Sequence, residues 1–409
     1  MLAPRLKANG RAFAHITQYH PELVAFRRDL HAHPELGFEE VYTSGRVQQE
    51  LKLCGVDEVH TGLGQTGVVA VVRGKQPSAK TARVKMVGLR ADMDALPMAE
   101  HNDFAWKSAT PGKMHACGHD GHTAMLMGAA RYLAETRNFA GSVALIFQPG
   151  EEGYAGARAM MHDGLFTRFP CDEVYAIHNS PETAEGVIGI TPGPMQAAVD
   201  RIEIVVTGKG GHGARPQNGV DSVLVAAHII TAAQSIVSRN VAALDQVVLS
   251  ICSVQGGSPQ AMSVIPGQVT LVGTVRTYRP EMQDIVEQRL RTLCQAIAAG
   301  FGANATLHYE RVYPATINTV PQAHFACDVA AQLVGEERVI RNMPPSMGGE
   351  DFSFMLQAVP GAYIRLGQGT SAGQPGCFLH NSKYDFNDEV LPLGAALFAG
   401  LVERAMPLV

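Results

Sequence analysis

Short apolar segments rich in β-branched residues alternate with longer helical segments in the first half of the chain and again near its end. The apolar segments predict strands at Gly67–Val72, Arg83–Leu89, Ser142–Phe147, Glu173–Ile177 and Ala362–Leu366. Between them, runs such as Thr123–Thr136 have the pattern of helices. Strands that are apolar at nearly every position lie in sheets that are covered on both faces. The pattern therefore predicts an α/β fold with a central, mostly parallel sheet flanked by helices.

The middle of the chain has a different pattern. Its elements are a strand at Ala198–Thr207, a helix at Asp221–Ser238, strands at Gln246–Val254 and Val269–Thr277, a helix at Pro280–Ala299 and a strand at Asn304–Val312. Asp221 is predicted to cap the first helix. Pro280 fits the first position of the second helix, and Gly300 fits the C′ position that follows it. The order β-α-β-β-α-β is that of a ferredoxin-like α+β domain.

Composition excludes several classes of protein. The chain has 409 residues, of which 46% are hydrophobic and 17% charged, so it is not mostly disordered. A net charge of -5 argues against nucleic-acid binding, which needs a basic face. No apolar run reaches the about 18 residues of a membrane span, and the N-terminal segment lacks the apolar stretch of a signal peptide. The 7 cysteines are scattered, without CxxC. We therefore expect a cytoplasmic protein that binds neither nucleic acid nor a membrane.

Histidines are common, and they cluster. The 16 histidines outnumber the 15 phenylalanines, and three of them lie with a cysteine in the segment Met114–His122. Because Cys117 and His119 are two residues apart, their thiolate and imidazole can reach one metal from a tight turn. The alternatives are a polar helix N-terminus capped by Asp120 and a cysteine–histidine nucleophile. The metal interpretation is favoured because acids and histidines recur where such a site needs them.

Carboxylates and an imidazole follow several predicted strands. Glu151 and Glu152 come soon after Ser142–Phe147, and two neighbouring acids can divide metal binding and proton transfer between them. Asp94 and His178 follow two further strands. In open α/β sheets, functional groups gather at the carboxyl ends of the strands. Any one of these side chains could instead belong to a surface turn, but together they predict a metal centre with a carboxylate base.

Later motifs complete the predicted organisation. A glycine-rich loop in the middle part presents His212, and a Gly-Gly-Glu-Asp segment is interpreted as a helix N-cap at Asp351. If His178 and His380 serve one site, the chain must leave the catalytic domain and return to it. We therefore predict a discontinuous catalytic domain with an inserted second domain. The predicted boundaries are 1–192 and 313–409 for the catalytic domain and 193–312 for the insertion.

Seven motifs together resemble a known family. In chain order they are RADMDALP, HACGHDGHTAM, QPGEEGYAGA, AIHN, GGHGARP, GGEDFSF and FLHN. The set is similar to the di-metal metallopeptidase family of aminoacylases, bacterial glutamate carboxypeptidase and hippurate hydrolase. Within that family it looks like the branch of hippurate hydrolase and indole-acetyl-amino-acid hydrolase. The resemblance runs from the segment that begins at His31 to His380, which is almost the whole chain.

The resemblance implies roles for nine residues. Those implied to bind two divalent metals are Cys117, His119, Glu152, His178 and His380. Zinc or manganese is expected, with cobalt and nickel as alternatives. Glu151 would be the general base and acid, and Asp94 would steady the ligands. His212 and Arg276 would contact the substrate, and the inserted domain would act as a lid and join a homodimer, with a tetramer as the alternative. The chain has Asp92 where many relatives have histidine and Ser263 where many have asparagine, so Asp92 is not assigned as a ligand and the asparagine's substrate contact is in doubt.

The function implied by the resemblance is hydrolysis of a small-molecule substrate. The amide bond of an N-acyl amino acid such as hippurate would be cleaved to a carboxylic acid and a free amino acid. A dipeptidase, or a deacetylase of an N-acetyl amino acid such as N-acetyl-diaminopimelate, would use the same metal centre. A non-catalytic binding protein on this fold is the remote alternative, because Glu151 and all five implied ligands are present.

Overall fold

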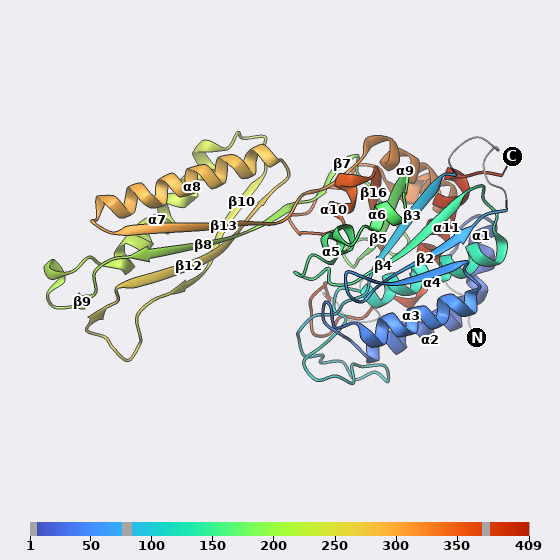
Figure 1. The fold of residues 1–409 in the computed structure, drawn as a ribbon, viewed down its shortest axis with the longest axis horizontal. Coiled ribbons are helices and arrows are strands. Elements are labelled where there is room, and N and C mark those ends of the chain that lie inside the picture. Colours follow the sequence, from blue (N-terminus) through green and yellow to red (C-terminus); the bar gives the residue numbers. More distant parts are fainter. Residues whose placement is uncertain (1–5, 76–83, 370–376, 409) are drawn as a thin grey trace. The chain divides into compact units, whose positions relative to one another are not determined.

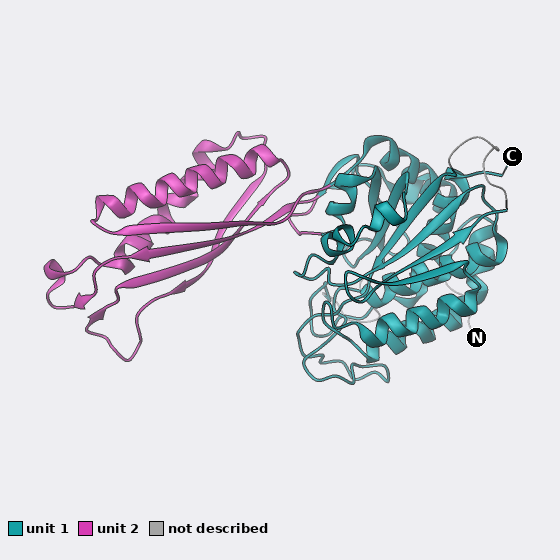
Figure 2. Cartoon of the chain, viewed as in Figure 1, with its two compact units in different colours: residues 1–195, 317–344, 351–409 teal, residues 196–316, 345–350 magenta. Residues whose placement is uncertain are grey.

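The structure is a computed structural model that describes residues 6–75, 84–369 and 377–408 (Figure 1). The chain divides into two compact units (Figure 2). Unit 1 comprises residues 1–195, 317–344 and 351–409, and unit 2 comprises residues 196–316 and 345–350. The sequence did not suggest that residues 345–350 return to the second unit, because a six-residue crossing has no pattern of its own.

Unit 1 is built on an eight-stranded mixed sheet of order β1-β2-β4-β3-β5-β16-β6-β15. The strands are β1 (Glu58–Leu63), β2 (Gly67–Arg73), β3 (Met86–Asp92), β4 (Ser142–Gln148), β5 (Glu173–Ser180), β6 (Ile188–Gly189), β15 (Val339–Ile340) and β16 (Gly361–Gly367). The central strands β4, β3, β5 and β16 run parallel, as predicted, while β2 and β6 run antiparallel to their inner neighbours. β1 was not expected, and Arg83, predicted to begin the strand that corresponds to β3, lies outside the described residues.

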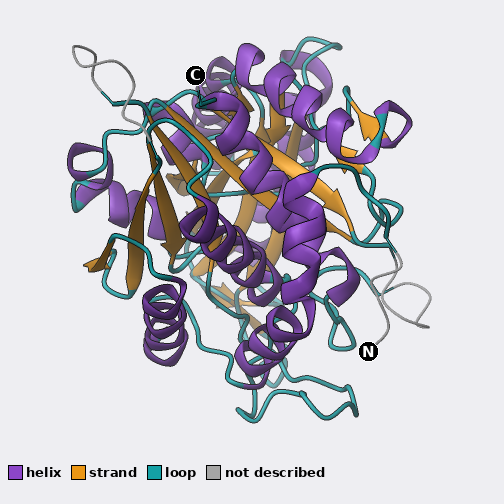
Figure 3. Ribbon diagram, turned by 90° about the vertical axis from the view of Figure 1, so that its right-hand side faces the viewer, coloured by secondary structure: helices purple, strands orange, loops and turns teal. Residues whose placement is uncertain are grey.

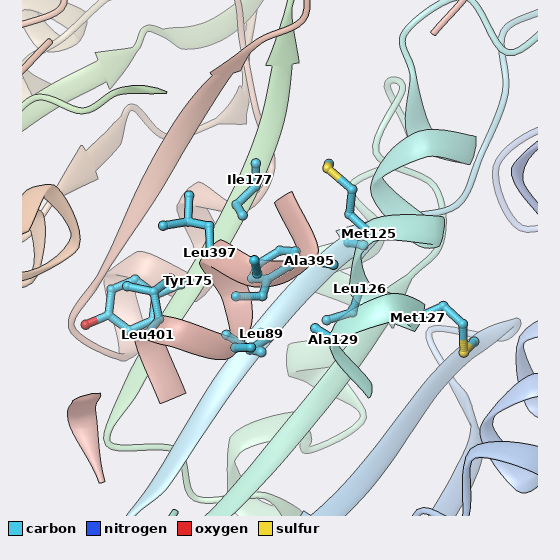
Figure 4. Packing of buried hydrophobic residues seen from close by; sticks show 14 of the residues in the cluster. Leu89, Met125, Leu126, Met127, Ala129, Tyr175, Ile177, Ala395, Leu397 and Leu401 are labelled. Atoms are coloured by element: carbon cyan, nitrogen blue, oxygen red, sulfur yellow. The ribbon is translucent and has the colours of Figure 1, made fainter. Parts of the chain in front are cut away.

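Helices cover both faces of this sheet (Figure 3). The helices that pack over the larger apolar core are α1 (Arg11–Ile16), α2 (His20–Ala32), α3 (Val41–Cys54), α4 (His119–Thr136), α9 (Val320–Val334) and α11 (Leu391–Ala405). The opposite face carries α5 (Gly156–His162), α6 (Leu165–Arg168) and α10 (Ser353–Ala358). Successive strand residues point to opposite faces, so Tyr175 and Ile177 join the first core and Val174 and Ala176 the second. Figure 4 shows Leu89 and Tyr175 packed with Leu126 and Leu397 in the larger core.

Unit 2 is the ferredoxin-like domain that the sequence predicts. Its elements are β8 (Ala198–Thr207), α7 (Ser222–Ser235), a π-helical turn (Ile236–Asn240), β10 (Val247–Gln255), β12 (Gln268–Thr277), α8 (Pro280–Gly300) and β13 (Asn304–Tyr313). The strands form an antiparallel sheet of order β10-β12-β8-β13. Two-stranded ribbons join β9 (Gly211–His212) to β11 (Val264–Ile265) and β7 (Gly193–Gln196) to β14 (Thr316–Asn318).

The helix ends of unit 2 follow the predictions in part. The Asp221 side chain caps α7, as expected, by accepting hydrogen bonds from the backbone N–H groups of Val223 and Leu224. Gly300, expected beyond the end of α8, is its last helical residue. Gly302 takes the left-handed conformation instead, with φ of 75°. The helix therefore extends slightly further than glycine placement alone suggested.

One helix in the described part of the chain, Ser222–Asn240, is long and apolar enough to cross a membrane by length and composition alone. Its inner residues Val225, Ile229 and Ala233 belong to the core of unit 2. About a third of the residues in its most apolar 18-residue segment are buried. A core helix passes the same length test, so this is weak evidence for a span.

We predict that Asp221→Ala destabilises unit 2 by about 1 kcal/mol, because two N–H groups of α7 lose their acceptor. Urea unfolding followed by circular dichroism measures the loss. Asp221→Ser keeps a capping oxygen and should retain most of the stability. Equal unfolding midpoints for wild type and the alanine variant would contradict the capping role.

Candidate metal centre

Several of the predicted site residues lie at the carboxyl ends of parallel strands in unit 1. β3 ends at Asp92, just before Asp94, and β4 ends at Gln148, just before the Glu151–Glu152 pair. His178 lies close to the end of β5. Because these strands are parallel, their carboxyl ends meet at one edge of the sheet, where α/β proteins place functional groups. The topology explains why residues distant in sequence converge.

The structure brings all five predicted metal ligands together. Cys117, His119 and His178 offer ligand atoms within 4.8 Å of one another, and so do Cys117, Glu152 and His380. The Cys117 Sγ lies 3.5 Å from Nε2 of His178. Nε2 of His380 lies 3.2 Å from Oε1 of Glu152. Because Cys117 belongs to both groups, this donor set fits two metal ions that share a thiolate.

Asp94 fixes the orientation of two of these ligands. His119 Nδ1 lies 2.9 Å from the backbone oxygen of Asp94 and 3.2 Å from its Oδ1. The other carboxylate oxygen, Oδ2, accepts a hydrogen bond of 2.9 Å from the backbone N–H of Glu152. His119 Nε2 is buried and has no hydrogen-bond partner among the described residues. An imidazole held through Nδ1 with a bare Nε2 is the arrangement of a metal-binding histidine.

Two unusual backbone conformations shape the centre. Gly118, which precedes α4, has φ of 94°, and a Cβ there would meet Asn179 Oδ1 at 2.6 Å and the Tyr384 hydroxyl at 2.7 Å. Only glycine fits between Cys117 and His119. His380 has φ of 62°, and its backbone N–H donates to the Ala116 carbonyl at 2.8 Å. Positive φ in a residue with a side chain is a strained conformation that is found at functional sites.

Burial shifts the pKa values of two of the ligands, Cys117 and His178. Burial raises the pKa of Cys117 above its ordinary value and, with the repulsion of His122 and Arg365, lowers the pKa of His178 well below its ordinary value. His178 is therefore neutral and has an electron pair to give to a metal. The Cys117 thiol needs a nearby cation to lose its proton at neutral pH, so metal binding and proton release are coupled.

Comparison with known proteins decides the family. A family model described as peptidase family M20/M25/M40 matches residues 88–404. The chain belongs to this family. It is 40% identical over 380 residues to the hippurate hydrolase of Campylobacter jejuni, with 93% of this chain and 95% of that protein covered. It is 37% identical to the N-acetylcysteine deacetylase of Bacillus subtilis, over 94% of this chain and 96% of that protein.

Plant and structural relatives agree with the assignment to the M20 family. IAA-amino acid hydrolase ILR1-like 4 of Arabidopsis thaliana is 37% identical, over 93% of this chain and 85% of that protein. A dinuclear metal-binding peptidase of the M20 family from Bacillus subtilis superposes with a TM-score of 0.81 at 32% identity, covering 96% and 99% of the two chains. A putative aminohydrolase from methicillin-resistant Staphylococcus aureus superposes with a TM-score of 0.87 at 28% identity, over 97% and 99%. The predicted family and fold class are confirmed.

The turn that carries Glu151 is held by a residue that the sequence analysis did not single out. Glu151 is buried, and its carboxylate lies within 4.8 Å of ligand atoms of His119 and Glu152. The backbone N–H of Gly150 donates to Oε1 of Glu40 at 2.8 Å. Burial raises the pKa of Glu40 to about 7. With Asp94 bound to the Glu152 N–H, two carboxylates hold the backbone on either side of Glu151. The only available signal was the acidic ending of the HPELGFEE segment.

Arg90, a buried arginine of β3, binds two buried carboxylates near the metal centre. Arg90 donates to Asp92 at 2.6 Å and to Asp351 at 3.1 Å. Burial alone would raise the pKa of Asp92, but Arg90 and neighbouring imidazoles bring it well below the ordinary value. Asp92 also lies 2.6 Å from Nδ1 of His122. Its oxygens are thus engaged by protein groups, in agreement with leaving Asp92 out of the ligand set.

The expected N-cap at Asp351 is wrong. α10 has no side-chain cap. The Asp351 carboxylate instead accepts hydrogen bonds from Arg90 and Gln148 and, at 2.8 Å, from the backbone N–H of Ala157 in α5. The sequence pattern predicted that the Asp351 carboxylate would bind the backbone of its own helix. Its partner is instead the buried Arg90, which is distant in the chain.

A second buried network lies behind α4. Nδ1 of His31 lies 2.8 Å from Oδ2 of Asp120, and its Nε2 lies 3.3 Å from Glu100. Arg27 pairs with the same Asp120 at 3.4 Å. Burial alone would lower the pKa of His31, but its bonds to Asp120 and Glu100 raise it to about 9. Asp120 follows His119 directly, so this network anchors the helix turn that carries the ligand.

The two predicted substrate contacts lie in unit 2. His212 is exposed in β9. Arg276 is half-buried in β12 and donates through Nε to the Thr274 hydroxyl at 3.1 Å. The backbone oxygen of Ser263 accepts a hydrogen bond of 2.7 Å from the backbone N–H of Gly213, beside His212. The roles of His212 and Arg276 remain predictions.

We predict that His31→Gln loses stability most at low pH. The folded pKa of about 9 lies above the ordinary 6.5, so protonated His31 stabilises the fold fully below pH 6.5, and the effect disappears as the pH rises through 9. The difference in unfolding free energy between wild type and variant should therefore shrink from pH 6 to pH 10. Urea titrations at one-unit intervals measure it.

His162→Gln is the matched control, because the His162 side chain is 90% exposed. Its difference from wild type should be near zero across the same range. If the difference in unfolding free energy between wild type and His31→Gln grew with pH, the His31 imidazole would be neutral in the folded protein.

Proposed function

We propose that this protein hydrolyses the amide bond of N-acyl amino acids at a two-metal centre, releasing a carboxylic acid and a free amino acid. One observation carries the proposal. The buried carboxylate of Glu151 lies beside the five converging ligand side chains, within 4.8 Å of ligand atoms of His119 and Glu152. A base next to a metal-ligand set is the arrangement that amide hydrolysis by water requires.

The five ligand residues would hold two divalent ions, which supply Lewis acidity that polarises the amide carbonyl and makes a water more acidic. Glu151 accepts the proton of the attacking water. It then delivers that proton to the leaving nitrogen, so one carboxyl group serves first as base and then as acid. Asp94 and Glu40 keep the turn that carries Glu151 in place during both transfers.

The donor set narrows the choice of metal. A thiolate with imidazoles favours zinc, cobalt or nickel, and the carboxylate of Glu152 leaves manganese open. We propose zinc or manganese as the native ions.

Features outside unit 1 complete the proposal. His212 and Arg276 would contact the substrate. Unit 2 would act as a lid and join a homodimer in the cytoplasm. The support is the resemblance of the motifs, together with the half-buried position of Arg276 without an ion-pair partner among the described residues.

A second candidate is deacetylation of N-acetyl amino acids at the same centre. It is favoured by the 37% identity to an N-acetylcysteine deacetylase. The chemistry at the metals is unchanged, and only the fit of the acyl group differs. Rates with hippurate, N-acetyl amino acids and dipeptides would rank these activities.

We predict that Glu151→Gln lowers kcat for hippurate at least about 100-fold while metal content stays near wild type, because it removes the base without removing a ligand. The matched variant is Glu152→Gln. It changes the neighbouring residue and should lose both activity and bound metal.

Metal analysis by mass spectrometry and hippurate hydrolysis, each with added zinc or manganese, check both variants. Full turnover by Glu151→Gln would disprove its role. Absence of hydrolysis of every compound by the metal-loaded wild type would contradict the proposed function as a whole.

A further inference from the structure

Arg365 is a half-buried cation without an acidic partner. Within the described residues no carboxylate lies within ion-pair distance of it, and the segments that are not described contain no aspartate or glutamate side chain. The two fully buried arginines of unit 1 differ in this respect. Arg27 pairs with Asp385 and Asp388, and Arg90 with Asp92 and Asp351. Within the described part of the chain, the Arg365 guanidinium makes one hydrogen bond, from Nη1 to the Asn179 carbonyl at 3.5 Å.

Its position is next to the proposed metal centre. In the parallel pairing of β16 with β5, Arg365 is opposite His178. Neighbouring strands are about 4.8 Å apart, and side chains in register point to the same face. The ring of Tyr363, two residues earlier on the same strand, lies 5.5 Å from the Arg365 guanidinium carbon and 6.1 Å from the His178 ring. The bond to Asn179 shows that the guanidinium extends toward the end of β5, where the ligands converge.

A cation at this place is unfavourable by itself. Burying part of a charge without a counter-ion costs free energy, and two divalent ions nearby would repel it. The site therefore lacks an anion that would offset the charge. A guanidinium offers a planar pair of donors that matches a carboxylate.

We propose that Arg365 binds a carboxylate of the substrate. The inference rests on the proposed function and extends it to substrate recognition. The carboxylate has two sources: the α-carboxylate of the amino-acid part, or a second acid carried by the acyl group or the amino-acid side chain. Both are anions on an N-acyl amino acid, and only substrate comparison separates them.

The kinetic test compares Arg365→Gln and Arg365→Lys with wild type on four compounds. These are hippurate, its neutral amide benzoylglycinamide, benzoylglutamate and N-succinylglycine. Loss of a charged hydrogen bond should raise KM about tenfold or more with little change in kcat, and Arg365→Lys should recover part of the loss. If the α-carboxylate is bound, KM for hippurate rises and KM for benzoylglycinamide does not. If a second acid is bound, KM rises only for benzoylglutamate or N-succinylglycine.

Arg168→Gln is the matched control. Arg168 is an exposed arginine of unit 1 whose guanidinium carbon also lies 5.5 Å from an aromatic ring, that of Phe169. The Arg168→Gln substitution removes the same charge and a similar ring contact, but away from the carboxyl ends of the parallel strands. Every KM should therefore stay within twofold of wild type.

A binding experiment makes the test independent of turnover. Calorimetry measures the dissociation constants of hippurate, benzoylglutamate and N-succinylglycine with metal-loaded Glu151→Gln, with and without Arg365→Gln. At least one acid should bind about tenfold more weakly to the double variant. If both proteins bind every compound alike, the inference is wrong, even where wild type hydrolyses them. If wild type hydrolyses none but binding depends on Arg365, the proposed function fails and the carboxylate site stands.

Discussion

The metal centre depends on the two contacts of the Asp94 carboxylate, because they join two proposed ligands that come from different parts of the fold. One oxygen approaches the imidazole of His119 at the start of α4, and the other binds the backbone of Glu152 after β4. The two elements are thus fixed relative to each other before any ion binds. A neutral or shorter side chain at position 94 would leave the imidazole and the turn to move independently, and small displacements of such ligands weaken both binding and catalysis.

Around this link, the protein satisfies its other buried charges in networks. Arg90, Asp92 and Asp351 form one, and Arg27, His31 and Asp120 another. Each places a buried acid between cationic or imidazole partners, which offsets the cost of removing it from water. The two networks hold different parts of the site: the first includes residues near the ends of β3 and β4, and the second includes Asp120 in the first turn of α4. Rigid support of this kind is what a preorganised centre needs.

Much of this could be predicted from sequence, but not all. The strands of the four-stranded sheet of unit 2 agree with the pattern to within a residue or two, because alternation and turn residues are local signals. The convergence of Cys117, Glu152 and His380 could be expected from strand order and from the family resemblance. Glu40, His31 and the true partners of Asp351 could not. Their roles come from contacts between residues distant in the chain. The sequence does not distinguish a carboxylate that is buried from one that is exposed. Arg365 was missed for the same reason, since its lack of a counter-ion is a property of the fold.

The order of strands also determines when the centre can form. β16 is placed between β5 and β6 in the sheet, yet it comes from residues 361–367, and the proposed ligand His380 follows later still. The strands and helices of unit 2, in contrast, come from one stretch of chain, residues 198–313. As the chain emerges from the ribosome, that stretch can fold while the larger sheet still lacks β15 and β16, which come from later residues. Completion of the proposed five-ligand set is therefore a late event in biosynthesis, because His380 is added only when nearly the whole polypeptide has been made.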